Sequence, residues 1–270
     1  MFEKIGDIYV NGLFPDIAAK STIGTPFLCA GIVLTALIAY ILGSFNFALI
    51  LSKKMYGEDI RDHGSKNAGT TNMMRTYGKK AALFTILGDI GKGLLSVIAG
   101  SFLLGAAFGG GYFAGLCCVI GHVFPLFYGF KGGKGVATAA AVILMVDPLV
   151  CLVVLGIFIL TVVLTRYVSL GSCLGAALFP FLTFYHVVGN PAFPGGGIAF
   201  VCALIMAMIV ICKHHTNLRR LANGTESKFS FKKSKPTGEK AENKDGEAED
   251  SHTYTAKKKK KNRKFTAKKK

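Results

Sequence analysis

The stretch FKGGKGVAT, residues 130–138, places two lysines and three glycines between two long apolar runs. Glycines carry no side chain, so the backbone N–H groups of such a loop can converge on an anion. A helix that begins near Val136 would direct its N-terminal N–H groups and partial positive charge to the same point, and Lys134 would add a full charge. The stretch predicts a phosphate-binding loop formed by Gly132, Gly133, Lys134 and Gly135. Its spacing differs from the nucleotide-binding pattern GxxxxGK[ST], and the alternative is a glycine hinge with snorkelling lysines.

A second polar stretch, residues 58–80, is longer than a plain connection between two apolar runs needs to be. It carries hydroxyls, amides and a guanidinium on Ser65, Asn67, Thr70, Thr71, Asn72 and Arg75. Donors of fixed geometry beside a delocalised positive charge are what a phosphate or a glycerol-like polyol requires. We therefore expect this loop to bind substrate. The alternative is a solvated loop whose Ser and Thr cap helices.

A third polar stretch, residues 213–226, follows the last apolar run. His214 and Asn217 are three positions apart, so they share one face of a helix that continues past the run. Both side chains could then point into a site at the membrane surface. Ser172 gives a weaker signal, because it follows Gly171 at what reads as a plain helix start.

Ionisable residues within the apolar runs are few. Asp89 and Lys92 are three positions apart, and because charges are expensive in lipid we expect a structural ion pair near the site. The seven cysteines all lie in apolar runs and form no Cys-x-x-Cys pair. They are expected to be small buried apolar side chains, and no metal or cofactor is expected.

The composition predicts a membrane protein, because 51% of the 270 residues are hydrophobic. A helix needs roughly 20 apolar residues to cross a bilayer. Long apolar runs cover residues 27–51, 80–105, 108–128, 148–165, 170–187 and 197–212, and a shorter run covers 136–146. We expect an all-α integral membrane protein with seven transmembrane helices.

The basic residues predict its orientation. With seven spans, Lys and Arg gather at 52–80, at 131–134, at Arg166 and in the tail. They are absent from the connections around 106–110, 147–148 and 188–196. Because cytoplasmic loops are enriched in Lys and Arg, the N-terminus is expected outside, and the C-terminus and every polar stretch on the cytoplasmic side. A six-span count without 136–146 would put Arg166 and the tail outside.

The C-terminal tail is strongly basic. Residues 213–270 carry 19 Lys and Arg against 7 Asp and Glu, a net +12 of the chain's +17. We divide the chain into an extracytoplasmic N-terminal extension, 1–26, a membrane domain, 27–226, and a disordered Lys-rich cytoplasmic tail, 227–270. Such a tail is attracted to anionic lipid by about 1 kcal/mol per charge near the surface. A specific partner such as nucleic acid is the alternative and is not expected.

Read as whole segments, the polar stretches resemble the acyl-phosphate-dependent glycerol-3-phosphate acyltransferase (PlsY) family of bacterial membranes. The matching segments, in the family's order, are DIRDHGSKNAGTTNMMRTYGKKAAL, GHVFPLFYGFKGGKGVATAAAV, YVSLGS and KHHTNLRRLANGTE. The resemblance covers about residues 30–227 and implies seven spans in the bacterial inner membrane, with the motifs on the cytoplasmic face. It also implies transfer of an acyl group from acyl phosphate to the 1-hydroxyl of glycerol 3-phosphate. The products would be lysophosphatidic acid and phosphate, in the first step of membrane phospholipid synthesis.

Individual roles follow from the resemblance by position. It implies catalytic roles for Ser65, Arg75, Lys134, His214 and Asn217. It implies substrate-binding roles for Asn67, Thr71, Asn72, Gly132, Gly133, Gly135 and Ser172. The chain departs from the usual pattern at Phe45-Asn46, where the family usually has Ile-Pro, and at Lys213, where Arg is commoner. No departure removes one of these side chains.

The chemistry needs no acyl-enzyme, since phosphate is a good leaving group. The protein must instead hold two anionic substrates together against their repulsion. We expect Lys134 and the glycine-loop amides, helped by Ser65 and Arg75, to stabilise the charge on the leaving phosphate. His214 and Asn217 would orient glycerol 3-phosphate, and the acyl chain would lie between spans. Either His214 or a substrate phosphate oxygen could accept the hydroxyl proton.

Two other functions fit part of the pattern. A transporter of phosphate or phosphorylated solutes would also have basic loops, but here the polar residues gather on one face and most spans lack ionisable residues near mid-membrane. An acyltransferase that uses acyl thioesters would carry His followed five positions later by Asp. None of the six histidines has Asp at that spacing.

Overall fold

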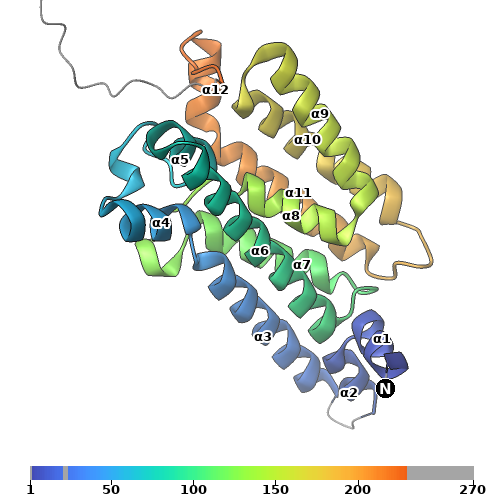
Figure 1. Cartoon of the computed structure of the whole chain (residues 1–270). Helices are drawn as coiled ribbons and strands as arrows, with labels where there is room; N and C mark the ends of the chain where they lie inside the picture. Colours follow the sequence, from blue (N-terminus) through green and yellow to red (C-terminus); the bar gives the residue numbers. More distant parts are fainter. Residues whose placement is uncertain (1, 21–23, 230–270) are drawn as a thin grey trace, which may run out of the picture. The chain divides into compact units, whose positions relative to one another are not determined.

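The computed structural model describes residues 2–20 and 24–229, and within these ranges the chain forms helices and no β-strand (Figure 1). The longer helices are α3 Gly24–Ser44, α6 Lys79–Leu104, α7 Gly110–Val123, α9 Pro148–Thr165, α10 Val168–Val187 and α11 Gly196–Lys213. The shorter ones are α1 Phe2–Asn11, α2 Leu13–Lys20, α4 Phe47–Tyr56, α5 Thr70–Tyr77, α8 Val136–Val146 and α12 His215–Ala222. Two 3-10 turns lie at Ile60–Asp62 and Leu126–Tyr128.

Six segments of the described chain are long and apolar enough to cross a membrane: α3 with α4, α6, α7 with the turn that follows it, α9, α10 and α11. The helical architecture expected from the apolar runs is therefore confirmed for the described residues. The short run forms α8, whose 11 residues extend about 16 Å, roughly half of a hydrocarbon core. The seventh crossing, and with it the side on which each terminus lies, remains a prediction.

The first apolar run is divided into two helices, α3 and α4. Asn46 caps α4, because its Oδ1 accepts a hydrogen bond from the N–H of Leu49 at 3.1 Å. An N-cap residue takes an extended backbone, which interrupts the helix that the apolar run would otherwise continue. The break leaves the last carbonyl groups of α3 without donors of their own helix.

Helix α7 lies in the core and packs against α3, α6, α8 and α11. Glycines allow its contact with α3. A Cβ at Gly43 would lie 2.1 Å from the carbonyl oxygen of Cys118, and one at Gly121 would lie 2.3 Å from that of Tyr40. Small residues permit such close approach of helices in lipid. The contact fixes the end of α7, from which the glycine loop emerges.

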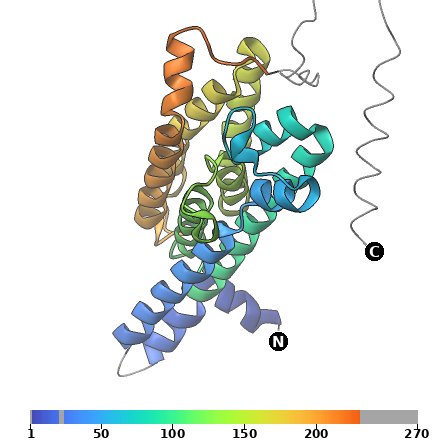
Figure 2. The same ribbon diagram turned by 90° about the vertical axis from the view of Figure 1, so that its left-hand side faces the viewer.

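Helices α4, α5 and α12 lie at one end of the helical domain, and α1 and α2 lie at the other (Figures 1 and 2). The N-terminal extension is folded onto the turn between α6 and α7. The N–H groups of Ala106 and Ala107 donate to the carbonyl oxygens of Tyr9 and Val10, at 2.9 and 3.1 Å.

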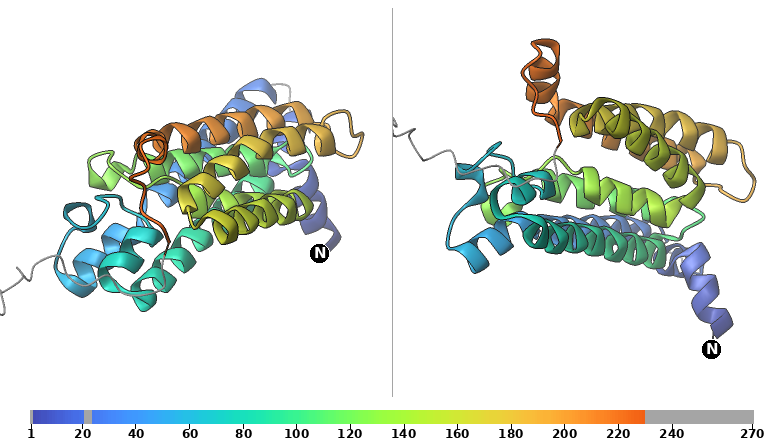
Figure 3. Two further views of the ribbon diagram at one scale, coloured as in Figure 1. Left: turned by 90° about the horizontal axis from the view of Figure 1, so that it is seen from above. Right: turned by 45° about the horizontal axis from the view of Figure 1, so that its top comes forward.

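Helix α8 lies between α6 and α9 and contacts both (Figure 3). Its N-terminus follows directly on the glycine loop, at the end of the domain that carries α5 and α12. The predicted Lys-rich tail lies outside the described residues from residue 230 onward, and the predicted domain boundaries remain predictions.

Candidate active site

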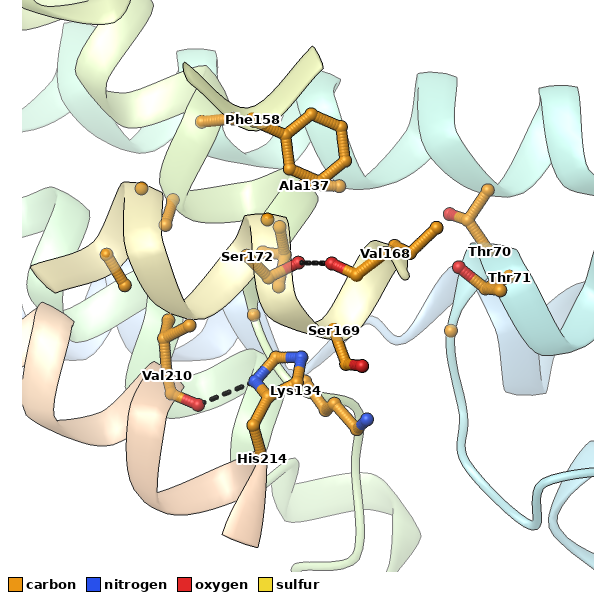
Figure 4. A pocket seen from close by; sticks show the side chains of 18 of the residues that line it. Thr70, Thr71, Lys134, Ala137, Phe158, Val168, Ser169, Ser172, Val210 and His214 are labelled. Atoms are coloured by element: carbon orange, nitrogen blue, oxygen red, sulfur yellow. Dashed lines mark hydrogen bonds between the residues drawn. The ribbon is translucent and has the colours of Figure 1, made fainter. Parts of the chain in front are cut away.

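A cavity of about 350 Å³ opens at the end of the domain that carries α5 and α12. Ten of the twelve predicted site residues line it: Ser65, Asn67, Thr71, Asn72, Arg75, Lys134, Gly135, Ser172, His214 and Asn217. Figure 4 shows Lys134, Ser169 and His214 grouped on one side of it, with Thr70 and Thr71 facing them. The structure thus brings together residues from all three polar stretches.

The rest of the cavity is apolar and extends between α8, α9, α10 and α11. It is lined there by Ile143, Cys151, Val154, Phe158, Phe179 and Met206. Met206 precedes His214 by eight residues, which corresponds to about 12 Å along a helix. The cavity therefore joins a polar end to an apolar channel that could receive the first part of an acyl chain.

Lys134 provides a positive charge at the polar end, and its Nζ–H group donates to Oδ1 of Asn217. Burial lowers the pKa of Lys134 to about 8, an effect that the Glu226 carboxylate opposes and that Arg220 and Arg75 reinforce. The side chain is therefore mainly an ammonium at neutral pH, but it is close to its titration range. A bound phosphate would raise the pKa again.

His214 lies between α11 and α12, where the helix expected to continue is interrupted. A carbonyl oxygen can only accept, so the 2.8 Å contact between His214 Nδ1 and the oxygen of Val210 places the ring proton on Nδ1 (Figure 4). Burial lowers the pKa of His214 to about 4, and Lys134 adds to the fall. At neutral pH His214 is therefore an uncharged imidazole whose Nε2 accepts hydrogen bonds.

Glu226 is a site residue that the sequence alone did not single out. Its carboxylate accepts hydrogen bonds at 2.8, 2.6 and 2.7 Å from Ser169, Asn217 and Arg220. Burial alone would raise the pKa of Glu226, but these hydrogen bonds outweigh it and lower the pKa. Glu226 is therefore ionised at neutral pH and ties α12 to the start of α10.

Asn72 was predicted to bind substrate, but its amide group is already bonded within the first loop. Oδ1 accepts from the N–H of Ser65 at 2.9 Å. Nδ2 donates to the carbonyl oxygens of Ile60, His63 and Asn67, at 3.1, 3.0 and 3.1 Å. Although Asn72 lines the cavity, this geometry gives it a structural part: it holds the loop that presents Ser65.

Gly132 and Gly133 do not line the cavity, and the expected convergence of their amides on an anion does not occur in this structure. Their N–H groups donate to the carbonyl oxygens of Val123 and His122, at 3.1 and 3.2 Å. A Cβ at Gly132 would lie 2.0 Å from the His122 oxygen, so the glycines are needed for this close contact. Gly135, with φ +79°, does reach the cavity at the start of α8.

Two further predicted residues, Ser172 and Arg75, line the cavity. The Ser172 hydroxyl donates to the carbonyl oxygen of Val168 at 2.9 Å, which leaves its oxygen able to accept (Figure 4). Burial lowers the pKa of Arg75, which still remains cationic at neutral pH. The expected ion pair between Asp89 and Lys92 is confirmed, at 3.0 Å.

The site combines cationic and hydroxyl groups at one end with an apolar channel at the other. Such a site fits a ligand with an anionic head and a hydrocarbon chain, as lipid-modifying membrane enzymes require. This defines the class as a membrane-embedded enzyme of lipid chemistry.

Comparisons with known proteins identify the family. The glycerol-3-phosphate acyltransferase family model matches residues 33–224. A glycerol-3-phosphate acyltransferase of Clostridioides difficile is 42% identical over 205 residues, covering 74% of this chain and 97% of its own length. One from Geobacter sulfurreducens is 46% identical over 198 residues, with coverages of 73% and 97%. The chain belongs to the glycerol-3-phosphate acyltransferase family, a family of multi-pass membrane acyltransferases.

Solved structures agree with this assignment. The crystal structure of PlsY, an integral membrane glycerol 3-phosphate acyltransferase, in its glycerol 3-phosphate form has a TM-score of 0.67 and 34% identity. It covers 74% of this chain and 96% of that one. The lysophosphatidic acid form gives 0.65 and 33% identity with the same coverages.

Proposed function

We propose that this protein transfers an acyl group from acyl phosphate to the 1-hydroxyl of glycerol 3-phosphate, releasing lysophosphatidic acid and inorganic phosphate. The observation that carries the proposal is a single cavity with Lys134 and Arg75 at its polar end and an apolar channel between α8 and α11. The related structures with glycerol 3-phosphate and lysophosphatidic acid support the acceptor and the product. The preference for acyl phosphate as donor rests on the site's suitability for two phosphate groups.

In this reaction the glycerol oxygen attacks the acyl carbonyl carbon, and the bond between that carbon and the phosphate oxygen breaks. Lys134 and Arg75, with the Ser65 hydroxyl, stabilise the charge that develops on the departing phosphate. A new ester bond forms, and the hydroxyl proton must leave the attacking oxygen.

His214 orients the attacking hydroxyl by accepting its hydrogen bond at Nε2. With a pKa of about 4, His214 is a weak base. The departing phosphate is the stronger base at neutral pH and takes the proton, so His214 and Asn217 serve to place the acceptor. This choice between two bases follows from the burial of the imidazole.

The protein acts, in this proposal, in the bacterial inner membrane, with the site open to the cytoplasm. The support is the positive charge of the connections on the site's side, at residues 52–80, 131–134 and 166. In this arrangement glycerol 3-phosphate enters from the cytoplasm and the acyl chain remains in the bilayer. The basic tail would attract anionic lipid on the same side.

Purified protein supplied in parallel with acyl phosphate, acyl-CoA and acyl carrier protein tests the donor. We expect labelled glycerol 3-phosphate to become lysophosphatidic acid with acyl phosphate alone, together with one equivalent of phosphate. Transfer from acyl-CoA but not from acyl phosphate would refute the donor. Failure with every donor, in protein that is folded and inserted, would refute the acyltransferase.

A further inference from the structure

Three buried ionisable side chains form a cluster beside the cavity, on α6 and α7. Lys92 Nζ lies 3.0 Å from Asp89 Oδ1 and 2.8 Å from His122 Nδ1. Each of the three residues is at most 4% exposed, and Asp89 and His122 also line the cavity. Ionisable groups within apolar helices are costly and mark functional positions in membrane proteins.

The contact with Lys92 favours one tautomer of His122. An ammonium group has three N–H donors and no acceptor. Two of them donate to the carbonyl oxygens of Gly43 and Phe45, both at 3.0 Å, and the third faces His122 Nδ1. Asp89 Oδ1 lies farther from Nδ1, at 3.4 Å, than Lys92 Nζ does, at 2.8 Å. The shorter contact favours Nδ1 as an acceptor, with the proton of a neutral ring on Nε2; the alternative tautomer would donate from Nδ1 to Asp89. Asp89 supplies the counter-charge.

The position of Lys92 follows from the break between α3 and α4. Carbonyl groups at the end of a helix lack intrahelical donors, and in an apolar environment they need a partner. Lys92 supplies donors to carbonyls on both sides of Ser44, the last residue of α3. Because Gly43 and Gly121 bring α3 and α7 into backbone contact, the same ammonium reaches the histidine on α7.

Nε2 of His122 faces the glycine loop. A Cβ at Gly133 would lie 2.3 Å from it. Within the described residues Nε2 makes no hydrogen bond. The carbonyl oxygen of Ala68 lies on the same side of Gly133 and is the competing acceptor for the Nε2 proton. His122 lines the cavity, so a ring N–H that makes no hydrogen bond there is available to a ligand.

The geometry points to His122 as a further anion-binding residue, whose Nε2–H donates to a phosphate oxygen of the substrate held by Lys134. Lys92 is a positioning residue that keeps the donor in this tautomer, and Asp89 pairs with the ammonium of Lys92. The inference rests on the proposed function and adds one more group to its phosphate site. A neutral donor strengthens anion binding without adding a charge that would have to be desolvated.

Two substitutions separate the two ring nitrogens. His122→Gln keeps a donor near the position of Nε2 but loses the acceptor that Lys92 needs. His122→Asn keeps an acceptor near Nδ1 but loses the donor that faces the cavity. We expect His122→Asn to lose about ten- to a hundred-fold in kcat/KM, as for a hydrogen bond to a charged group, with little loss of thermal stability. His122→Gln should lose less kcat/KM and more thermal stability.

The wild-type assay with acyl phosphate is the reference. If the proposed function is wrong, the wild-type protein itself shows no transfer, and this result differs from an effect confined to the His122 variants. KM measured for acyl phosphate and for glycerol 3-phosphate shows which phosphate His122 contacts, because only that KM should rise in the Asn variant. A larger activity loss in His122→Gln than in His122→Asn, or equal losses, would overturn the inference and leave His122 a purely structural residue.

A measurement on the wild-type protein keeps the inference testable if both variants unfold. Histidine labelled with nitrogen-15 reports which ring nitrogen is protonated, and the cavity can be titrated with inorganic phosphate. We expect one histidine with its proton on Nε2 whose Nε2–H signal moves on phosphate addition. The proposal is contradicted if no histidine Nε2–H signal responds to saturating phosphate. That result is expected if the Nε2–H group of His122 donates to the carbonyl oxygen of Ala68 instead.

Discussion

The two loops that lead into the cavity are held in place by different devices. The first, residues 58–69, is organised by a side chain, because the amide of Asn72 bonds to four backbone groups of the loop. The second, residues 129–135, is organised through its backbone, which bonds to the end of α7 and accepts one further hydrogen bond, from Arg61 to the carbonyl oxygen of Lys131. In each loop, groups that could have bound an anion hold the chain instead. The cation of Lys134 is what the second loop presents to the ligand.

The largest effect expected from this comparison is the loss of that cation. Lys134→Ala should reduce kcat about 10²- to 10³-fold, the size reported for removing one stabilising donor from a transition state. The thermal stability of the protein should change little. Steady-state kinetics with acyl phosphate, beside a melting curve in detergent, measures both.

Lys131→Ala is the matched control, because Lys131 stands three residues earlier in the same loop with an exposed side chain. It should retain wild-type kinetics. Equal losses in the two variants would show that the loop contributes only general positive charge, and the contrast between backbone and cation would then be wrong.

Removing the Asn72 amide that holds the first loop should affect stability as well as activity. Asn72→Ala leaves the Ser65 N–H group without its partner and removes one donor from each of the Ile60, His63 and Asn67 carbonyl oxygens, which keep a backbone N–H donor, so stability and activity should fall together. Unpaired buried polar groups cost about 1–3 kcal/mol each, and a loss of about 2 kcal/mol would lower the melting temperature by about 4–8 °C. If Asn72→Ala lost activity at unchanged melting temperature, Asn72 would be a substrate ligand after all.

The second loop offers a test through its glycines. In Gly133→Ala the new Cβ would lie 2.3 Å from His122 Nε2 and 2.5 Å from the Ala68 oxygen, so the loop must shift. A displacement of Lys134 by a fraction of an ångström should reduce kcat/KM about tenfold. Gly91→Ala in α6 is the control, because a Cβ there meets no atom within 4 Å. Wild-type kinetics in Gly133→Ala would mean that the close contact is not required.

How far the sequence predicts this molecule depends on what each feature requires. Long helices follow from apolar length, so α6, α9, α10 and α11 were expected close to where they lie. The break at Asn46 was not expected, because an apolar run carries no sign of the capping hydrogen bond inside it. The cytoplasmic orientation depends on whether α8 crosses the membrane, and its 11 residues are about half of the length that a crossing helix needs.

The site shows the same division. Residue types predicted which stretches meet, and ten of the twelve residues do line the cavity. What sequence could not supply is the partner of each polar group. Asn67 and Asn72 are the same residue type in one polar stretch, yet the amide of Asn72 is fully bonded within the chain. The role of Gly133 depends on its contact with the imidazole ring of His122, eleven positions earlier. The role of Glu226 depends on its hydrogen bonds to side chains of α10 and α12. A single acidic side chain at the end of a basic motif was the available signal for Glu226.

The smallest predicted effect is a pH dependence that belongs to Lys134. Because burial lowers the pKa of Lys134 to about 8, the free enzyme loses its ammonium as the pH rises through 8. The kcat/KM for acyl phosphate, which reports the free enzyme, should therefore be level near neutrality and fall about tenfold per unit above pH 8. Bound phosphate raises the pKa, so kcat should fall only at higher pH. In Lys134→Arg, whatever activity remains should no longer fall above pH 8, because arginine does not titrate in this range. If kcat/KM of Lys134→Arg still fell above pH 8, a group other than Lys134 would cause the decrease.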